Sequence, residues 1–423
     1  MSKFNTIDLF AGCGGLLEGF NASDLYHSVA CVEWDRPPVE NLIKRLKEKW
    51  GYQDAEQRVL HFDIQRTEEL FSGWSDDPDF KSGIGLNKLM DSSGEIDVII
   101  GGPPCQAYSL AGRIRDEHGM QNDYRNYLFE SYLRVVERCQ PKLFIFENVV
   151  GMLSASPDGT PIPDLIRKAF NEAGYDIVDD IRNKAVIDLT EYGVPQNRKR
   201  VILLGVRRDY FEEPTSQILD LFYDSILPKY KVKEKETVID AIGDLPKIIP
   251  CDTENSNSRV SHCVVGNDLT IKNHIPRFHN ERDINIFTEL AQDIVDGTFK
   301  YVSTNSLKEL YTEKTGKESN VHKYYVLREG EQSNTIPAHL YKDGLRHIHP
   351  DPTQARSITV REAARLQTFD DDYEFIGSAG SQYKMIGNAV PPRFAHVLAL
   401  AVSEILTNKY KNYIMQKDIS SVV

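Results

Sequence analysis

The strand and helix patterns that alternate over residues 1–206 constrain the fold of this chain more than any other feature. Amphipathic helical patterns cover residues 126–139 and 163–173, with short apolar or β-branched runs around them. Strands alternating with helices are typical of a doubly wound α/β fold with a mostly parallel sheet. The runs of strand length are FNTIDLF (4–10), HSVACVEWD (27–35), VLHFDI (59–64), IDVIIGG (96–102), LFIFENV (143–149), YDIVDDI (175–181) and RVILLGV (200–206).

The rest of the chain departs from this alternation. Residues 207–355 combine short strand patterns with loops rich in Asn, Ser and Thr, and they hold seven of the eleven histidines. Helical patterns return at 360–367 and 393–410. We therefore expect a first domain at 1–206, a smaller irregular domain at 207–379, and a segment at 380–423 that packs back on the first domain.

The charge balance bears on the partners of the protein. Its 50 Lys and Arg against 63 Asp and Glu give a formal net charge of −13, which counts against a protein that coats nucleic acid indiscriminately. Basic residues nevertheless concentrate in QNRKRVILLGVRR (196–208), around one strand pattern. Such a run is usually a solvated face, but it can also line a local basic cleft.

Cysteine usage and hydropathy indicate a cytoplasmic protein. The six cysteines are too few and too scattered for a disulfide framework, and they suit a reducing compartment. No apolar run approaches the roughly 20 residues of a membrane span, and the first ten residues do not resemble a secretory signal. Cys251, His262, Cys263 and His274 lack a close C-x-x-C pair, so we expect scattered loop residues there and no metal site.

A glycine-rich turn follows the first strand pattern. In DLFAGCGGLLEGF (8–20), Gly12, Gly14 and Gly15 stand between a strand and a helix. This turn leaves bare backbone N–H groups at a helix N-terminus, which suit a carboxylate or a phosphate. The motif is shorter than the dinucleotide fingerprint and is weak evidence alone.

Three further side chains extend this turn into a candidate adenosine pocket. Glu33 ends the second strand pattern, where an acidic residue can bind ribose hydroxyls. Trp34 beside it could lie flat on an adenine, and Asp63 at the end of the third strand could accept from the adenine amino group. Taken singly, each fits a surface carboxylate or a half-buried indole equally well. Their occurrence at successive strand ends favours the pocket.

The segment GGPPCQAYS (101–109) ends the fourth strand pattern in an unusual way. Two prolines cannot continue a ladder of backbone hydrogen bonds, and two glycines allow a tight turn and a close approach of another molecule. Cys105 is therefore held at the carboxyl end of a strand, where open α/β sheets bind ligands. By itself it fits a buried structural cysteine as well as a nucleophile.

Seven motifs in a fixed order resemble the DNA (cytosine-5) methyltransferase family. The resemblance implies a Rossmann-like S-adenosylmethionine-dependent methyltransferase sheet, with residues 1–206 as the catalytic, cofactor-binding domain. It also implies that residues 207–379 contain a target-recognition domain for double-stranded DNA. The motifs are DLFAGCGG, VEWD, GGPPCQAYS, ENV (147–149), QNRKR (196–200), RSITVREAARLQTF (356–369) and QYKMIGNAVPP (382–392).

The resemblance assigns the chemistry to four residues. Cys105 matches the nucleophile that adds to C6 of cytosine, which makes C5 able to accept a methyl group. Glu147 matches the acid that assists at ring N3, and burial at a strand end is expected to let it hold a proton. Arg198 and Arg200 share one face of an extended segment and match residues that contact the flipped base.

The resemblance also implies further contacts with cofactor and DNA. Phe10 matches a residue against the adenine, although it could equally be core. The other expected cofactor contacts are Ile64, Pro104, Leu128 and Asn388, and the expected nucleic-acid contacts are Gln106, Ser109, Arg113 and Arg198.

Two arginine-rich motifs of the second domain remain open to more than one interpretation. In RFHNER (277–282), the polar side chains are candidates for base contacts or belong to a salt-bridged turn before a helix. In RSITVREAARLQ (356–367), Arg356, Arg361 and Arg365 are expected to be structural or phosphate-contacting and not catalytic.

The sequence leads to one function with three alternatives. We expect a monomeric DNA (cytosine-5-)-methyltransferase that modifies a specific duplex sequence, as the partner of a restriction endonuclease with the same site. A tRNA cytosine-5 methyltransferase is the nearest alternative, although the long second domain favours a duplex reader. A catalytically inactive DNA-binding scaffold and a nicotinamide dehydrogenase are the others, and Cys105 together with Glu147 argues against both.

Overall fold

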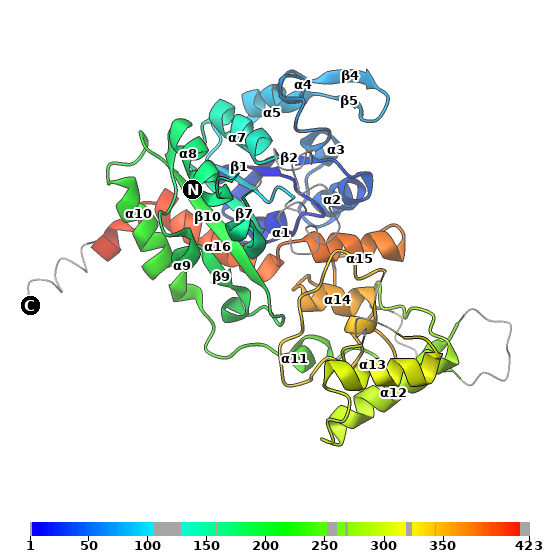
Figure 1. Cartoon of the computed structure of the whole chain (residues 1–423). Coiled ribbons are helices and arrows are strands. Elements are labelled where there is room, and N and C mark those ends of the chain that lie inside the picture. Colours follow the sequence, from blue (N-terminus) through cyan, green and yellow to red (C-terminus); the bar gives the residue numbers. More distant parts are fainter. Residues whose placement is uncertain are drawn as a thin grey trace, which may run out of the picture. The chain divides into compact units, whose positions relative to one another are not determined.

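The computed structural model describes residues 2–104, 128–156, 159–251, 260–266, 270–318, 324–342 and 344–414. The chain divides into two compact units. The first unit comprises Met1–Gly193, Arg198–Lys233 and Ala389–Val423, and the second comprises Val194–Asn197 and Glu234–Asn388 (Figure 1).

The first unit is built on an eight-stranded sheet. Its strand order is β3-β2-β1-β6-β7-β10-β8, and β9 also pairs with β10. The neighbours from β3 to β7 are parallel, whereas β10 runs antiparallel to β7, β8 and β9. The strands are β1 (Phe4–Leu9), β2 (Tyr26–Glu33), β3 (Val59–His61), β6 (Val98–Gly101), β7 (Leu143–Val149), β8 (Tyr175–Asp176), β9 (Val186–Asp188) and β10 (Lys199–Arg207).

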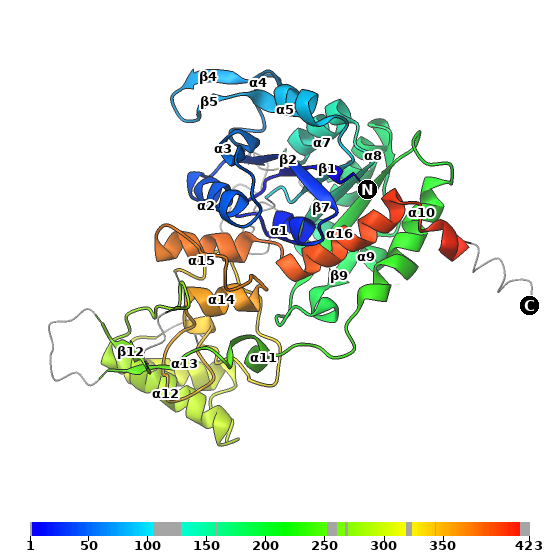
Figure 2. The same ribbon diagram turned by 180° about the vertical axis from the view of Figure 1, so that it is seen from behind.

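Helices cover both faces of this sheet (Figures 1 and 2). Helix α1 packs against α16, while α4 contacts α5 and α7, and α7 contacts α8. The helices are α1 (Gly15–Ala22), α2 (Arg36–Glu48), α3 (Ala55–Arg58), α4 (Thr67–Ser72), α5 (Gly85–Ser93), α7 (Leu128–Cys139), α8 (Ile162–Glu172), α9 (Ile181–Lys184), α10 (Thr215–Leu221) and α16 (Pro392–Leu406). Short 3-10 or π turns are η2 (Val150–Ser154), η3 (Leu189–Tyr192), η4 (Phe222–Ile226) and η5 (Pro228–Tyr230), and a separate hairpin joins β4 (Trp74–Asp77) to β5 (Lys81–Gly83).

The expected doubly wound α/β fold is confirmed, because each of the seven predicted runs contributes a strand to the sheet. The central strands are fully buried, as continuous apolar runs predict for strands covered on both faces. From Leu143 to Phe146 no side chain has any exposed surface. Tyr132 of α7 ties two of these strands together, since its hydroxyl lies 3.0 Å from the Ile145 carbonyl oxygen and 3.3 Å from that of Ile99.

The unit boundaries differ from the expected domain boundaries. We placed the start of the second domain at residue 207, whereas the first unit continues to Lys233. The reason is local packing. Tyr223 of η4 accepts a hydrogen bond from the Leu204 backbone N–H and donates one to the Ile202 carbonyl. The segment around Tyr223 therefore packs on β10 and belongs to the first unit. Near the C-terminus, α15 (Ala379–Asn388) belongs to the second unit, and the chain returns to the first unit at Ala389.

The second unit has more helices than strands among its described residues, and it has its own apolar core. Side chains of α12, including Ile286, Phe287 and Leu290, pack with Leu307 and Leu310 of α13. Its elements are α11 (Val238–Ile242), β11 (Ile248–Pro250), β12 (His262–Val264), α12 (Glu281–Val295), α13 (Thr304–Thr315), η6 (Gly344–Arg346), α14 (Val360–Leu366) and α15.

A disulfide in the second unit corrects one expectation from the sequence. Cys251 and Cys263 are bonded across the antiparallel β11–β12 pair, with their Cα atoms 5.5 Å apart. We expected no disulfide because the cysteines are scattered, but hairpin pairing brings these two together. The ring of His262 forms a hydrogen bond with the Gln354 carbonyl, and the ring of His274 forms one with the Pro246 carbonyl. Within the described residues no group of His, Cys, Asp or Glu side chains is arranged to hold a metal ion.

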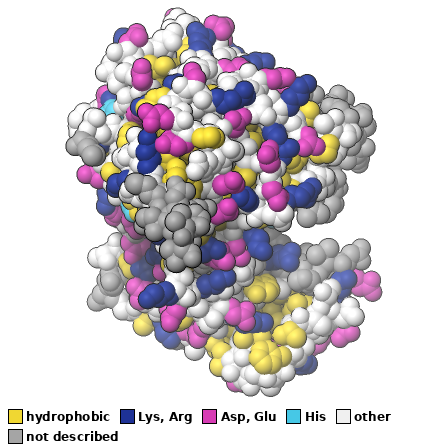
Figure 3. Space-filling view, turned by 90° about the vertical axis from the view of Figure 1, so that its left-hand side faces the viewer, with side chains coloured by type: hydrophobic (Ala, Val, Ile, Leu, Met, Phe, Trp, Pro, Cys, Tyr) yellow, Lys and Arg dark blue, Asp and Glu magenta, His cyan; other side chains and the backbone are white. Residues whose placement is uncertain are grey.

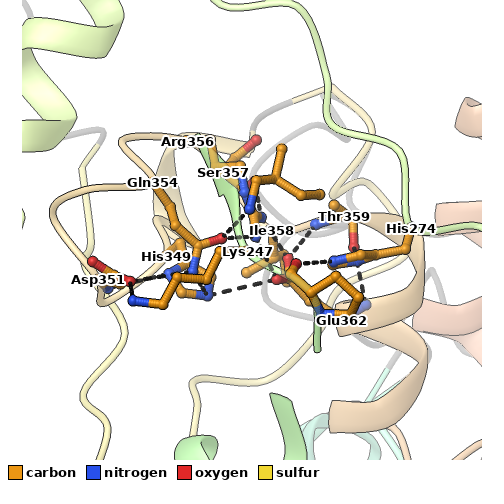
Figure 4. A network of polar contacts seen from close by, with 12 residues as sticks. Lys247, His274, His349, Asp351, Gln354, Arg356, Ser357, Ile358, Thr359 and Glu362 are labelled. Carbon is orange, nitrogen blue, oxygen red and sulfur yellow. Dashed lines mark hydrogen bonds and ion pairs between the residues drawn. The ribbon is translucent and has the colours of Figure 1, made fainter. Parts of the chain in front are cut away.

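A buried polar network organises the second unit (Figure 4). Arg356 donates two 2.7 Å hydrogen bonds to the Glu362 carboxylate. Both side chains are buried, with exposed fractions of 0% and 1%. Glu362 also accepts from the Thr359 backbone N–H in a capping box that begins α14. Further hydrogen bonds compensate part of the desolvation of this buried bidentate pair: Nη2 of Arg356 also donates to Oε1 of Gln354 at 2.6 Å, whereas its Nε has no partner within the described residues.

The other two arginines of this motif are also structural, as we expected. Arg361 is fully buried and donates to the carbonyls of Lys272, Asp370 and Tyr373. Arg365 forms an ion pair with Asp371.

The described surface mixes both signs of charge. On the face drawn in Figure 3, Lys and Arg side chains lie interspersed with Asp and Glu side chains. One stretch of the described chain, Ala379–Leu406, has the length and hydropathy of a membrane-spanning helix. Because 67% of its apolar window is buried inside the protein, it has the character of a core helix.

Two neutral histidines make the stability of the second unit sensitive to acid. Burial lowers the pKa of His279 and of His349 to about 4, and each ring accepts a hydrogen bond from a backbone N–H, of Ser357 and Asp351 respectively. The unfolded chain binds these protons near pH 6.5, so the stabilisation is complete above that pH and is lost as the pH falls towards 4. We expect a loss of roughly 1–3 kcal/mol per histidine.

Urea unfolding at pH about 7.5 and about 5 measures this loss. His279→Gln and His349→Gln should flatten the pH dependence, whereas His339→Gln, at an exposed position of the same unit, should leave it unchanged. Equal acid sensitivity in all three variants would contradict the assignment.

Candidate active site

The predicted nucleophile segment starts at the carboxyl end of β6. The strand ends at Gly101, and Pro103 and Pro104 follow, of which Pro104 is exposed. Asn148 of β7 fixes this exit, because its side-chain amide donates to the Pro103 carbonyl at 3.3 Å. The predicted site residues Cys105, Gln106, Ser109 and Arg113 lie outside the described residues.

Glu147 lies directly beside this exit, near the carboxyl end of β7. A Cβ atom added at Gly102 would lie only 2.6 Å from Oε2 of Glu147, so glycine is required for this close approach. Oε1 of Glu147 forms a 2.8 Å ion pair with Nε of Arg200, and both side chains are mostly buried. The sequence argument did not include this cationic partner of the carboxyl group.

The two predicted arginines reach the same edge through β10. In the antiparallel register Arg200 is opposite Val149, and Ile202 is opposite Glu147. Arg198, one residue before the strand, is 2% exposed and donates from Nη2 to the Ala389 carbonyl at 3.0 Å. Burial lowers the pKa of both guanidinium groups, with the neighbouring Arg200 adding to the effect on Arg198. The arrangement concentrates positive charge around a single carboxylate.

The predicted cofactor residues at the first two strand ends also come together. Glu33 accepts hydrogen bonds at 2.8 Å from the backbone N–H groups of Gly12 and Asp35. Burial raises the pKa of Glu33, and these two hydrogen bonds oppose the shift. Phe10, at the end of β1, has a φ of 57°, a left-handed conformation that is uncommon for a residue with a side chain. Gly14 and Gly15 begin α1, with Gly14 at the N-cap in the left-handed region.

Asp8 is a candidate residue that the sequence analysis missed. Its side chain is 1% exposed, and within the described chain neither carboxylate oxygen has a hydrogen-bond partner. Burial, with the nearby Glu33 as a second cause, raises the pKa of Asp8 well above its usual value. An unsatisfied buried carboxyl group is costly and typical of functional sites. The signal in the sequence was an acidic residue between Ile7 and Leu9 of the first predicted strand.

The remaining predicted cofactor residues occupy different environments. Trp34 is 52% exposed. The His61 ring donates to the backbone carbonyl of Trp34 at 2.9 Å. Asp63 accepts from the Gln65 backbone N–H, and Ile64 is buried. Leu128 is buried at the start of α7, whereas Asn388 is the exposed last residue of α15 in the second unit.

The QNRKR motif is divided between the two units. Gln196 is fully buried in the second unit, where it donates to the Leu366 carbonyl and accepts from the Ile336 N–H. Asn197 donates its backbone N–H to the Ser333 carbonyl at 2.8 Å. From Arg198 on, the motif belongs to the first unit. The motif therefore combines an anchor of one unit with the arginines of the other.

The RFHNER segment shows the structural alternative that the sequence left open. Arg277 donates to the Leu340 and Tyr341 carbonyls, and its guanidinium group lies 4.1 Å from the ring centroid of Tyr383. Asn280 caps α12, and Arg282 pairs with Asp283.

Comparison with known proteins identifies the family. The family model for C-5 cytosine-specific DNA methylases matches residues 4–404. The chain belongs to the C-5 cytosine-specific DNA methylases. It is 34% identical to the type II methyltransferase M.Bpa9945I of Bacillus paralicheniformis, over 96% of this chain and 99% of that protein. It is 30% identical to the type II methyltransferase M.DdeI of Desulfomicrobium norvegicum, over 96% and 89% of the two chains.

Solved structures agree with this fold. A prophage-encoded protein from E. coli superposes with a TM-score of 0.61 at 22% identity, covering 96% of this chain and all of the other. The S. pombe Dnmt2 methyltransferase superposes with a TM-score of 0.53 at 15% identity, covering 96% and 99%.

The family membership settles the reaction class. This methylase transfers a methyl group to C5 of cytosine in DNA and requires a methyl-donor cofactor. Membership of this family excludes the dehydrogenase alternative.

The close approach of Gly102 to Glu147 leads to a testable consequence. Gly102→Ala should displace the Glu147 carboxylate and lower kcat by about a hundredfold, because a shift near 1 Å misaligns a reacting group. Gly330→Ala is the matched control, since a Cβ there meets open space and kcat should stay unchanged. Steady-state methylation of plasmid DNA measures both, and full activity of Gly102→Ala would contradict the arrangement.

Proposed function

We propose that this methylase uses S-adenosylmethionine and binds it along the ends of β1, β2 and β3. Glu33 retains acceptor positions for ribose hydroxyls, because backbone N–H groups occupy only part of its carboxylate. The buried Asp8, without a hydrogen-bond partner in the described chain, suits a ligand that carries positive charge. When bound, S-adenosylmethionine supplies an electrophilic methyl group.

The part of the site that binds the cofactor's adenine holds this ring by stacking and hydrogen bonding. The half-exposed indole of Trp34 offers an open face to the adenine ring, and Asp63 accepts from its amino group. Phe10, Ile64, Pro104 and Leu128 complete the apolar surroundings of the cofactor, and Asn388 is a further proposed cofactor contact.

Cys105 is the nucleophile of the proposed mechanism. Its thiolate forms a bond to C6 of the target cytosine, which breaks the aromatic system and makes C5 nucleophilic. Glu147 assists at ring N3 as negative charge builds there. After C5 has received the methyl group, the C5 proton leaves and the bond between Cys105 and C6 breaks, which restores the ring.

The ion pair between Glu147 and Arg200 is the observation that carries this proposal. It lies at the edge of the sheet from which the Cys105 segment departs, where a pyrimidine ring could contact both strands. Arg200 holds the carboxyl group in position, and the basic QNRKR segment supplies positive charge that favours a thiolate over a thiol. Both arginines contact the oxygen of the flipped base.

Recognition of double-stranded DNA is assigned to the second unit and to the segment after Cys105. The target base must leave the helix before its C6 can be reached, which costs roughly a few kcal/mol. Gln106, Ser109 and Arg113 contact the DNA around the vacated position. The second unit, which overlaps the irregular domain that we expected at 207–379, reads the bases in a groove.

The type II methyltransferases among the relatives support a role in restriction-modification. In this role the enzyme protects a specific sequence against a cognate endonuclease. It acts in the cytoplasm as a monomer, since one chain carries both the predicted nucleophile and the residues assigned to the cofactor.

Replacement of the nucleophile tests the mechanism. Cys105→Ser should lower the methylation rate by about three orders of magnitude or more, because covalent activation of the ring is lost. Transfer of a labelled methyl group to DNA, followed by digestion to nucleosides, measures the rate and locates the label on 5-methylcytosine.

A covalent trap provides the second arm of this test. DNA with 5-fluorocytosine at the target cannot lose a proton from C5, so the unaltered enzyme should remain bound through Cys105 in denaturing gels. Cys139→Ala, at a buried cysteine of α7, should methylate and be trapped normally. Trapping of Cys105→Ser would refute the assignment.

A further inference from the structure

Trp34 belongs to an aromatic cluster that the proposed mechanism does not use. The rings of Phe80 and Trp34 meet in an edge-to-face arrangement, with centroids 5.7 Å apart and planes at 75°. The same ring meets His61 at 5.1 Å and Phe62 at 5.3 Å, both edge to face. Phe80 is thus the residue that joins Trp34 to the side chains at the end of β3.

Phe80 comes from the hairpin of β4 and β5, which lies beside α4 and α5 (Figure 2). Two interactions fix this hairpin to the sheet. Trp74 of β4 stacks on Phe62, with centroids 3.8 Å apart, and its indole N–H donates to the Phe80 carbonyl. Arg66 binds the Asp77 carboxylate at 2.6 Å and lies over the Phe62 ring.

The turn of the hairpin is preformed around Asp77. Oδ1 of Asp77 accepts hydrogen bonds from the backbone N–H groups of Asp79 and Phe80, at 3.0 and 2.9 Å. This pattern is an Asx-turn, which defines the backbone without help from a ligand. The Phe80 ring is therefore held against Trp34 by the hairpin itself.

Trp34 needs such a support because half of its side chain is in solvent. Its backbone is fixed through the His61 ring, but a tryptophan side chain exposed at 52% can leave one rotamer for another. Loss of that freedom on ligand binding weakens affinity, and preorganisation avoids this loss. Phe80 contacts the indole on one side, and 52% of Trp34 remains exposed.

We propose that Phe80 is a positioning residue for the cofactor, which fixes the Trp34 indole in the orientation that stacks on the adenine. The proposal rests on the proposed function, in which Trp34 lines the adenosine pocket. It adds a role for the β4–β5 hairpin, which acts through Trp34 and does not touch the reacting atoms.

Binding of S-adenosylhomocysteine to the full chain, measured by calorimetry, tests this role. Phe80→Ala should raise the Kd about 3–10-fold, the range expected for one edge-to-face aromatic contact. Phe80→Tyr keeps the ring and should bind within about twofold of the unaltered protein. Asp79→Ala is the control on the same turn, because its side chain is exposed and Kd should not change.

A double-mutant cycle separates positioning from a general loss of structure. In a Trp34→Ala background, Phe80→Ala should have no further effect on Kd. In steady state Phe80→Ala should raise KM for the methyl donor, leaving kcat and the KM for DNA unchanged. An unchanged Kd for Phe80→Ala, or an equal loss in both backgrounds, would overturn the proposal.

The result also distinguishes this proposal from the function on which it rests. If the unaltered protein does not bind S-adenosylhomocysteine, the proposed cofactor is wrong. If it binds and Trp34→Ala binds equally well, the cofactor assignment stands and the role of Phe80 is refuted.

Discussion

The antiparallel placement of β10 beside β7 is the constraint on which the catalytic arrangement depends. A parallel strand at this position would send its first residues to the opposite edge of the sheet. Because β10 runs the other way, Arg200 meets Glu147 at the edge where β6 releases the segment to Cys105. A change of direction in one strand thus assembles three sequence motifs that are far apart along the chain.

Buried arginines recur in both units, and the protein stabilises them in two ways. Arg356 has a carboxylate partner in Glu362, whereas Arg361 is surrounded by backbone carbonyls. Both solutions give the guanidinium group several acceptors, which its fork geometry can reach at once. Arg198 combines a carbonyl with the field of the Glu147 carboxylate.

The sequence predicted the sheet, the flanking helices and the family from local patterns and motif order. Glu147, Arg198 and Arg200 could be assigned to one site from the resemblance, whereas the α/β alternation predicts a mostly parallel sheet and does not predict the antiparallel direction of β10. Other features depend on pairing between distant segments, which periodicity does not encode. The Cys251–Cys263 bond, the contact of Phe80 with Trp34 and the division of QNRKR between two units are of this kind. The Asp8 carboxyl group belongs here too, because its lack of a hydrogen-bond partner within the described residues depends on the side chains packed around it.

The anchoring of residues 196–200 restricts how genes of this kind can change in length. Asn197 is bonded to Ser333 on one side, and the β10 ladder begins two residues later. A single codon inserted between them would shift the strand by one position and turn Lys199 in place of Arg200 towards Glu147. Surface loops tolerate added residues at small entropic cost. Insertions and deletions in the coding sequence should therefore concentrate in the loops and be absent from residues 196–200.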